Sequence, residues 1–392
     1  MFNFKCDYMK IALLGFDIDG SNMGCQALVY SFLSLLSSVY KGDIEAVVFI
    51  YGDCDISTIE KKYSNIKFKT INSSLKSVKS QKLVLKEFNS CNFIFDVTYG
   101  DGFSDIYGKI WNVRTNLNKE LAIKSNARFV LLPQTYGPFN SSILKKWASH
   151  IVKNADYAFT RDKESAIEFN KLIKVEKVYS TTDLAFLLPY NKVDREFESK
   201  KIGFNVSSTL WDNTHSKSIV LKTDYKQYCI NLIRDLKDLG YEIHLIPHVI
   251  DINNYKAVEN DVRACYELKD IVGDVIVAPS FDNPIDIKSY ISGMDIFIGA
   301  RMHATIGAFS SNTITIPVAY SKKFEGLYGN LGYRYIIDLR KLTTEDAVLL
   351  TKEFIEKKDE LSENQRYSME VASKEILDFS KKFKELLNVY YI

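Results

Sequence analysis

The sequence predicts an α/β protein of two domains, each built around a parallel sheet. Its 392 residues are more than one α/β core usually needs and enough for two. Short apolar runs alternate with helical patterns along the chain, which is typical of strand–helix–strand repetition. The apolar runs are also continuous, without regular polar positions, as expected of strands that are buried on both faces of a parallel sheet.

The first domain is predicted to span residues 1–190. Its strand candidates are 10–16, 46–51, 66–71, 92–97, 128–133, 157–160 and 177–180. Helical patterns between them include residues 25–40 and 142–154. The polar and charged segment 189–200 has no clear period, so it predicts the linker to the next domain.

The second domain is predicted to span residues 200–343, with a separate C-terminal helical part at 344–392. Its strand candidates are 201–206, 242–247, 274–278, 295–299, 313–318 and 335–338. Its helix candidates are 224–239, 254–268, 284–293 and 302–310. Since ligands bind at the carboxyl ends of strands in open α/β sheets, we expect the site in a cleft between the two domains.

Composition excludes several classes of function. The 51 basic and 49 acidic residues leave a net charge of +2, which requires no nucleic acid as partner. The six cysteines have no metal-ligand spacing, so no metal is expected. The apolar run 9–15 is too short to span a membrane and lacks a signal-peptide pattern, which predicts a cytoplasmic protein. Motifs of kinases, common hydrolases and dinucleotide-binding proteins are missing, so no cofactor is expected.

Arg301, Met302 and His303 form the strongest candidate segment, because they follow a predicted strand and open a helix. Arginine offers a planar fork for carboxylate or phosphate, and histidine can hold a phosphate oxygen or move a proton. The alternative is an arginine paired with a carboxylate and a histidine that caps a helix. Lys322 and Lys323 open the next helix, where two positive charges oppose the helix dipole unless an anion is bound. The alternative is a pair of lysines that are simply solvated.

Five further candidates follow other strands or glycine turns. Asp101 lies in a glycine-rich turn and could accept sugar hydroxyls or act as a general base, unless the turn is only structural. Gln134 could bind hydroxyls and Arg161 an anion, although a rigid turn and a local ion pair explain them equally well. Asn22 lies in a loop open to a ligand, and His248 follows a strand, where a lone histidine is more often structural.

Taken together, these segments resemble the polysaccharide pyruvyl transferase family over most of the chain. The most specific parts are Gly-Ala-Arg-Met-His at 299–303 and Ile-Pro-Val-Ala-Tyr-Ser-Lys-Lys at 316–323. Pro-Gln-Thr-Tyr-Gly-Pro at 133–138, Thr-Arg-Asp at 160–162 and Pro-His at 247–248 stand in the family's order. The chain departs from the family at Gly24-Cys25, where members often have Gly-Asp.

The resemblance implies two Rossmann-like domains in a glycosyltransferase-B-like arrangement, with the acceptor on the first domain and phosphoenolpyruvate on the second. The implied reaction moves a pyruvyl group onto two hydroxyls of a sugar, as a cyclic ketal, in a precursor of a capsule or exopolysaccharide. It needs no metal or nucleotide cofactor. The acceptor is often lipid-linked in this family, which is compatible with peripheral contact at the inner face of a membrane.

We expect a catalytic group and a binding group among the candidates. His303, Arg301 and Asp101 are the expected catalytic residues. The expected substrate-binding residues are Arg161, Lys323, Lys322, Met302, Gln134, Asn22 and His248. Two alternatives stay open: a nucleotide-sugar-dependent glycosyltransferase of the same architecture, and a catalytically inert family member that binds sugar.

Overall fold

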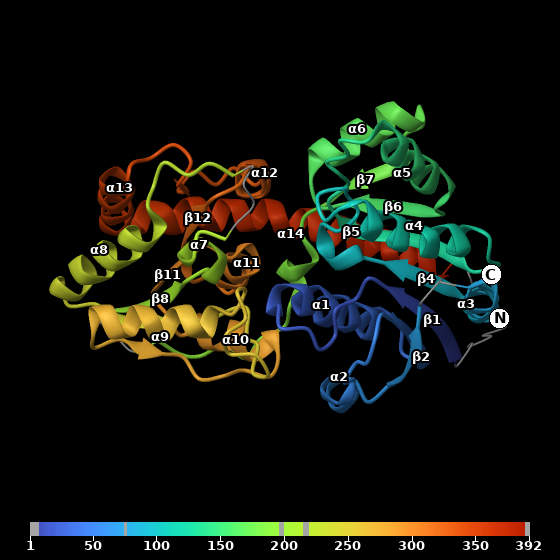
Figure 1. Ribbon diagram of the computed structural model, residues 1–392, viewed down its shortest axis with the longest axis horizontal. Helices are drawn as coiled ribbons and strands as arrows, with labels where there is room; N and C mark the ends of the chain where they lie inside the picture. The colour runs from blue at the N-terminus through green and yellow to red at the C-terminus, as the bar shows by residue number, and fades with distance from the viewer. Residues whose placement is uncertain (1–7, 74–76, 196–199, 215–218, 389–392) are drawn as a thin grey trace. The chain divides into compact units, whose positions relative to one another are not determined.

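The computed structural model describes residues 8–73, 77–195, 200–214 and 219–388. The chain forms two compact units, each an α/β sandwich (Figure 1). The first unit comprises Met1–Asp19, Leu28–Leu187 and Glu375–Ile392, and the second comprises Gly20–Ala27 and Leu188–Lys374. Residues 196–199 of the predicted linker and Cys6 lie outside the described residues.

The first unit contains a seven-stranded sheet in the order β3-β2-β1-β4-β5-β6-β7, and every neighbouring pair of strands is parallel. The strands are β1 (Tyr8–Leu14), β2 (Asp43–Ile50), β3 (Ile66–Asn72), β4 (Phe93–Asp96), β5 (Arg128–Gln134), β6 (Tyr157–Thr160) and β7 (Val178–Ser180). All seven coincide with predicted strands. A strand that is buried on both faces gives a continuous apolar run, which can be recognised in the sequence without an alternating pattern.

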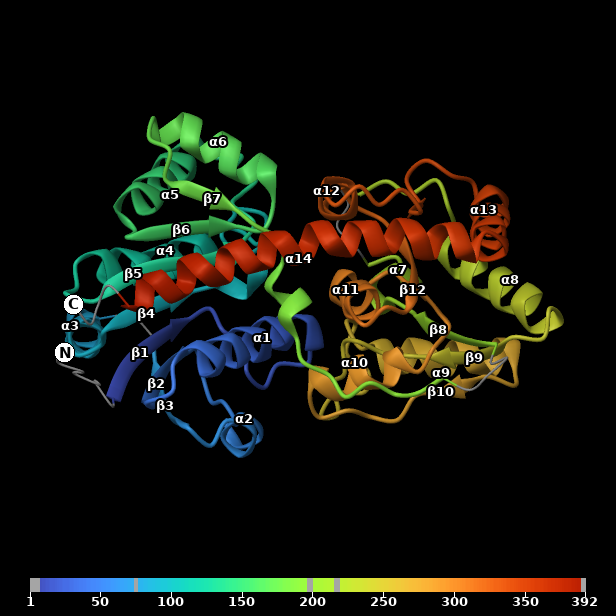
Figure 2. The ribbon, with the colours of Figure 1, turned by 180° about the vertical axis from the view of Figure 1, so that it is seen from behind.

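Helices cover both faces of this sheet. They are α1 (Met23–Val39), α2 (Ser57–Lys62), α3 (Val78–Asn89), α4 (Lys109–Ile123), α5 (Ser142–Asn154) and α6 (Lys163–Ile173). Side chains of β4 alternate between the faces: Ile94 packs in the core under α3 to α6, whereas Phe95 contacts Phe32 of α1 and Phe383 of α14. Figure 2 shows α1 and α14 (Lys358–Asn388) over that second face.

The second unit contains a six-stranded parallel sheet in the order β10-β9-β8-β11-β12-β13. The strands are β8 (Lys201–Asn205), β9 (Glu242–Leu245), β10 (Ile276–Val277), β11 (Ile296–Gly299), β12 (Ile314–Ala319) and β13 (Ile337–Asp338). The helices are α7 (Ser208–Trp211), α8 (Tyr225–Asp238), α9 (Asp261–Val272), α10 (Pro284–Ser292), α11 (Met302–Ser310), α12 (Lys322–Asn330) and α13 (Thr344–Glu356).

One predicted helix of this unit begins later than the sequence suggested. The helix expected at 254–268 is α9, which begins only at Asp261, because Asn260 caps it by accepting from the Val262 N–H. Before it, the Asp251 carboxylate accepts from the N–H groups of Asn253 and Asn254 and holds a turn instead of a helix.

Both sheets reverse their strand order beside their first strand, at the β1/β4 and β8/β11 pairs. At such a switch point neighbouring crossovers leave on opposite faces, which opens a crevice at the carboxyl ends of the strands. The predicted fold class, two Rossmann-like parallel-sheet domains, is confirmed by these two sheets. Among the described residues, no helix is both long and apolar enough to span a membrane.

Candidate functional site

The switch point of the second unit is held by Asn205, the last residue of β8. Its fully buried amide donates to the Ile246 carbonyl, and its oxygen accepts from the Arg301 N–H at 2.9 Å. One side chain therefore links the ends of β8, β9 and β11, and it fixes the backbone from which Arg301 projects.

Arg301 is held by a buried carboxylate. Its Nε and Nη2 groups donate to Asp261, with Nη2 2.7 Å from Oδ1, and Nη2 also lies 3.3 Å from the Ser208 hydroxyl. Asp261 is fully buried, while the Arg301 side chain keeps 14% of its surface exposed. Burial alone would lower the pKa of Arg301, but the attraction of Asp261 outweighs it and raises that pKa. The guanidinium is thus fixed by one edge and permanently charged.

Asp261 also gathers three backbone groups around the site. Its two oxygens accept from the N–H groups of Ser208, His248 and Val249. A buried carboxylate with this many donors is fully satisfied, so its position is tightly defined. The sequence analysis did not single out Asn205 or Ser208, since nothing local in the sequence marks them.

His303 lies in the first turn of α11, where N–H groups at a helix start favour an anion. Its ring packs on Gly24, because a Cβ built on that glycine would lie 2.4 Å from His303 Nδ1. The segment around Gly24 is itself pinned to this unit: Met23 N–H donates to the His248 carbonyl, and Ile250 N–H donates to the Ser21 carbonyl. Asn22, a predicted binding residue, accepts from Gly24 N–H and so helps to begin α1.

His248 is a buried histidine close to Arg301 and His303. His248 is 5% exposed, and neither of its ring nitrogens has a hydrogen-bond partner among the described residues. Burial lowers the pKa of His248 to about 3, and the electrostatic interactions with His303 and Arg301 act in the same direction, although Asp261 opposes the shift. Such an unsatisfied polar group needs an explanation, and an incoming ligand is one.

The other predicted cations of this unit follow the neighbouring strand. Lys322 and Lys323 are the first residues of α12, directly beyond β12, with Lys322 exposed and Lys323 half-buried. Met302, the first residue of α11, is half-buried beside Arg301. Since β11 and β12 are adjacent and parallel, these residues and Arg301 project from the same edge of the sheet.

In the first unit, the switch point is occupied by a strained turn. Thr98, Tyr99 and Gly100 have φ values of 36°, 56° and 86°. A Cβ on Gly15, at the end of β1, would lie 2.5 Å from the Thr98 Cα, so the turn passes directly over a glycine. Consecutive left-handed residues other than glycine cost conformational energy and occur mainly at functional sites.

Asp101 and Arg161 lie together at this turn. Arg161 Nε donates to the Thr135 hydroxyl at 2.8 Å, and Nη1 donates to the buried Asp183 at 2.7 Å. Burial would lower the pKa of Arg161, yet the charges of Asp183 and Asp101 raise it. Asp101 is half-buried, and its Oδ1 accepts from the Tyr107 hydroxyl at 2.8 Å. The structure thus brings these two predicted residues together.

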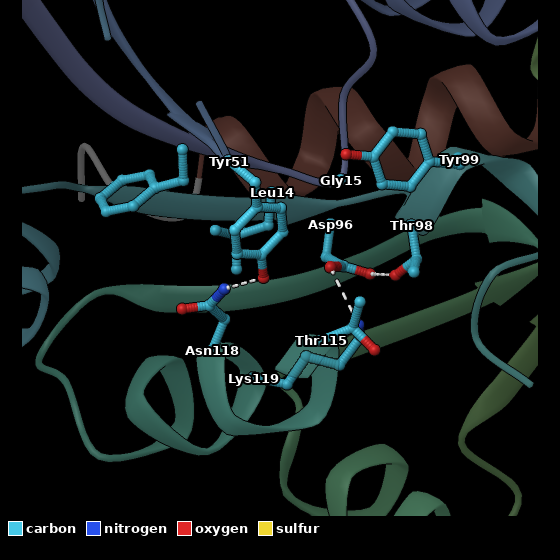
Figure 3. Close-up of a pocket in the computed structure, with 10 residues that line it drawn as sticks. Leu14, Gly15, Tyr51, Asp96, Thr98, Tyr99, Thr115, Asn118 and Lys119 are labelled. Atoms are coloured by element: carbon cyan, nitrogen blue, oxygen red, sulfur yellow. Dashed lines mark hydrogen bonds and ion pairs between the residues drawn. The ribbon is translucent and has the colours of Figure 1, made fainter. Parts of the chain in front are cut away.

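Beneath the turn lies a small hollow lined by Asp96, Thr98 and Lys119 (Figure 3). The Asp96 carboxylate lies 3.2 Å from the Lys119 ammonium and accepts from the Thr98 hydroxyl at 2.6 Å. Gln134 is completely buried, and its amide donates to the same Asp96. The hydrogen bonds from Gln134 to Asp96 support a role for Gln134 in holding the turn. Its role in substrate binding stays a prediction.

Among the described residues, no cluster of three or more His, Cys, Asp or Glu side chains could hold a metal ion. The candidate residues described above gather in two polar centres, one in each unit. Arg301, His303 and His248 share the first with Asp261. Asp101 and Arg161 share the second.

A family model described as polysaccharide pyruvyl transferase matches residues 22–322, which is most of the chain and includes every predicted site residue except Lys323. The chain belongs to the polysaccharide pyruvyl transferase family. It is therefore a member of a family of transferases that act in polysaccharide biosynthesis, as the resemblance implied. The comparison with curated protein sequences found no match to this chain.

Solved structures share the fold over both units. A UDP-GlcNAc 2-epimerase from Neisseria meningitidis bound to UDP-GlcNAc aligns with a TM-score of 0.60 at 10% identity, over 95% of this chain and 100% of that one. A putative UDP-N-acetylglucosamine 2-epimerase from Listeria monocytogenes gives 0.59 at 10%, over 96% of each chain. A glycosyltransferase from Rickettsia africae gives 0.58 at 11%, over 97% and 98%. At such identities the likeness concerns the fold alone.

Proposed function

We propose that this family member transfers a pyruvyl group from phosphoenolpyruvate to a sugar of a surface-polysaccharide precursor, forming a cyclic ketal. The observation that carries the proposal is the Arg301 guanidinium, held by Asp261 at the start of α11 next to His303. Phosphoenolpyruvate carries a carboxylate and a phosphate, and this group of donors is suited to both. Among the described residues, the hydrogen bonds of Arg301 use Nε and Nη2, so its Nη1 edge can serve the ligand.

In the proposed reaction, a sugar hydroxyl oxygen bonds to the central enol carbon while the methylene carbon takes up a proton. The bond between that carbon and the phosphate oxygen then breaks, and inorganic phosphate leaves. A second hydroxyl closes the ketal and releases its proton. Charge grows on the departing phosphate, so fixed cations aimed at it lower the barrier. Arg301, His303, Lys322 and Lys323 are the proposed phosphate ligands.

Asp101 is proposed as the group that takes the hydroxyl proton. A general base must stand close to the proton it removes, and its geometry must be fixed. The Tyr107 hydroxyl donates to the Asp101 carboxylate and orients it, and Arg161 lies close enough to interact with its charge. His303 then binds the phosphate or supplies the proton to the methylene group. No cofactor or metal enters this scheme.

The test compares ligands by thermal shift. Phosphoenolpyruvate, UDP-sugars and GDP-sugars are each added to the wild type, to Arg301→Ala and to Arg263→Ala. Arg263 is a matched control, since its guanidinium pairs with Asp212 and Glu267 in the same unit, and not with Asp261. A ligand that binds the folded state raises the unfolding temperature.

Stabilisation by phosphoenolpyruvate that survives Arg263→Ala and is lost in Arg301→Ala would support the proposal. Stabilisation by a nucleotide sugar alone would overturn it and favour a glycosyltransferase, the class to which one similar structure belongs by its name. Binding of saccharides with no response to any donor would instead indicate an inert sugar-binding protein.

A further inference from the structure

The helix α4 buries polar side chains and exposes apolar ones over its first turns, whereas Leu121 and Ile123 near its end pack against the core of the first unit. Its buried side is polar and comprises Asn112, Thr115, Asn116, Asn118 and Lys119, with Ala122. Its exposed side carries Ile110, which is 86% exposed, and Val113, which is 40% exposed. Surface helices normally bury the apolar stripe and expose the polar one, so this inversion leaves an apolar face without cover in the described chain.

The exposed apolar side chains continue into the segment before α4. Ile106 and Tyr107 are 44% and 55% exposed, so four large side chains of this kind occur within eight residues. Single exposed apolar residues are ordinary, but a contiguous group marks an interaction surface. We name this group, with Lys109 and Arg114, the α4 entry surface.

The buried side of α4 explains why the helix is inverted. Lys119 pairs with Asp96 under the strained turn, and Asn118 donates to the Tyr51 hydroxyl (Figure 3). Asn112 donates to the Ser104 carbonyl. These contacts fix the polar side against the sheet. The apolar side is therefore turned outward by the network that supports the Asp101 turn, and it cannot rotate inward without breaking that network.

The positive charge of the α4 entry surface indicates an anionic partner. Lys109 and Arg114 are exposed, and the sequence has no acidic residue from 106 to 119. Asp105, the nearest acid along the chain, accepts from the N–H groups of Asn140 and Ser141 at the start of α5, and the Asp101 carboxylate accepts from the Tyr107 hydroxyl. Isoleucine, valine and tyrosine side chains flanked by cations are the features of segments that lie in the interface of an anionic bilayer.

We propose that the α4 entry surface docks this protein on an anionic lipid bilayer, with Ile110 and Val113 inserted and Lys109 and Arg114 at the headgroups. The surface follows Asp101 in the chain by only a few residues, so docking would hold the first unit close to any membrane-bound substrate. The proposal is independent of the proposed reaction, and it is tested without an activity measurement.

The experiment is vesicle sedimentation of the full chain with equimolar phosphatidylglycerol and phosphatidylcholine, and with phosphatidylcholine alone. The variant is Lys109→Gln with Ile110→Ser on α4. The matched control is Lys171→Gln with Ile167→Ser on α6, where Ile167 is 70% exposed and Lys171 is exposed. Circular dichroism confirms that both variants are folded. Analytical ultracentrifugation of each protein measures self-association.

We expect the wild type and the α6 control to bind the anionic vesicles, and the α4 variant to bind at least about tenfold more weakly. Raising the salt from about 0.1 M to 1 M should also weaken wild-type binding, since it shortens the range of the headgroup attraction. Equal binding by the α4 variant, or equal binding to both vesicle types, would overturn the proposal. So would a wild-type dimer that the α4 variant alone dissociates, since the surface would then be covered by a second copy.

Discussion

Gly24 and the His303 ring are packed so closely that no side chain fits between them. A Cβ on Gly24 would lie 2.4 Å from Nδ1 and 2.9 Å from both Cβ and Cγ of His303. These residues are far apart in the sequence, but both belong to the second unit. The glycine thus sets the position of the histidine ring, which the proposed reaction places at the phosphate.

Replacing Gly24 should therefore damage the site more than the fold. In Gly24→Ala the His303 ring must shift, and a displacement of about 1 Å at a reacting group can cost on the order of 100-fold in rate. Phosphoenolpyruvate affinity, measured by calorimetry, should fall in the same variant. Gly326→Ala is the control, because a Cβ there has nothing within 4 Å. Unchanged affinity in Gly24→Ala would show that the ring position is irrelevant to binding.

Asp261→Asn should destabilise the second unit strongly. The substitution leaves the buried Arg301 charge without its counter-ion, and breaking a buried pair in this way costs about 3–5 kcal/mol of unfolding free energy. Urea unfolding measures the loss. Asp212→Asn is the control, because the Asp212 side chain is 27% exposed whereas Asp261 is fully buried, and pairs open to solvent contribute about 1 kcal/mol or less. Similar losses in the two variants would contradict the buried-pair account.

His248 should make the protein acid-sensitive. Its pKa is about 3 in the folded protein against 6.5 for an ordinary histidine. Between these values the unfolded chain binds a proton that the folded protein does not, so stability falls as the pH falls through this window. One such proton contributes a slope of up to about 1.4 kcal/mol per pH unit.

The measurement is urea unfolding at a series of pH values from neutral to acid. His248→Gln should remove its part of the slope, so that the variant loses less stability than the wild type on acidification. His150→Gln, at an exposed position of α5, should keep the wild-type slope. If the slopes of wild type and His248→Gln coincide, His248 is not buried in its neutral form.

Asp101→Asn should separate binding from reaction. A general base contributes about 100- to 10,000-fold to rate, so phosphate release in the presence of acceptor should fall by that order. Phosphoenolpyruvate affinity should stay within a few-fold of wild type, because the proposed donor ligands are elsewhere. Tyr107→Phe, which removes only the hydroxyl that orients Asp101, should lower the rate less. Rates that are equal in Asp101→Asn and wild type would exclude Asp101 as the base.

The strands and the main candidates were predictable from local sequence. Apolar runs such as β5 and β11 are continuous because both faces of each sheet are covered, and this pattern needs no knowledge of the partners. Arg301, His303 and Asp101 were found because each stands just after such a run, at the edge where parallel sheets bind ligands. The late start of α9 was missed because the Asp251 turn and the Asn260 cap compete with a helical pattern of similar strength.

The remaining features depended on contacts between distant parts of the chain. Asp261 lies 40 residues from Arg301, and no spacing rule connects an acid on one helix with an arginine after a strand. The inverted α4 was invisible for the same reason, since its polar residues are buried only because Asp96, Ser104 and Tyr51 receive them. The sequence by itself determined the two parallel sheets, the sheet edges at which the candidate residues lie, and the family. Only the tertiary structure decided which side chains hold Arg301, why Gly24 must be small and which face of α4 meets solvent, because these depend on long-range packing.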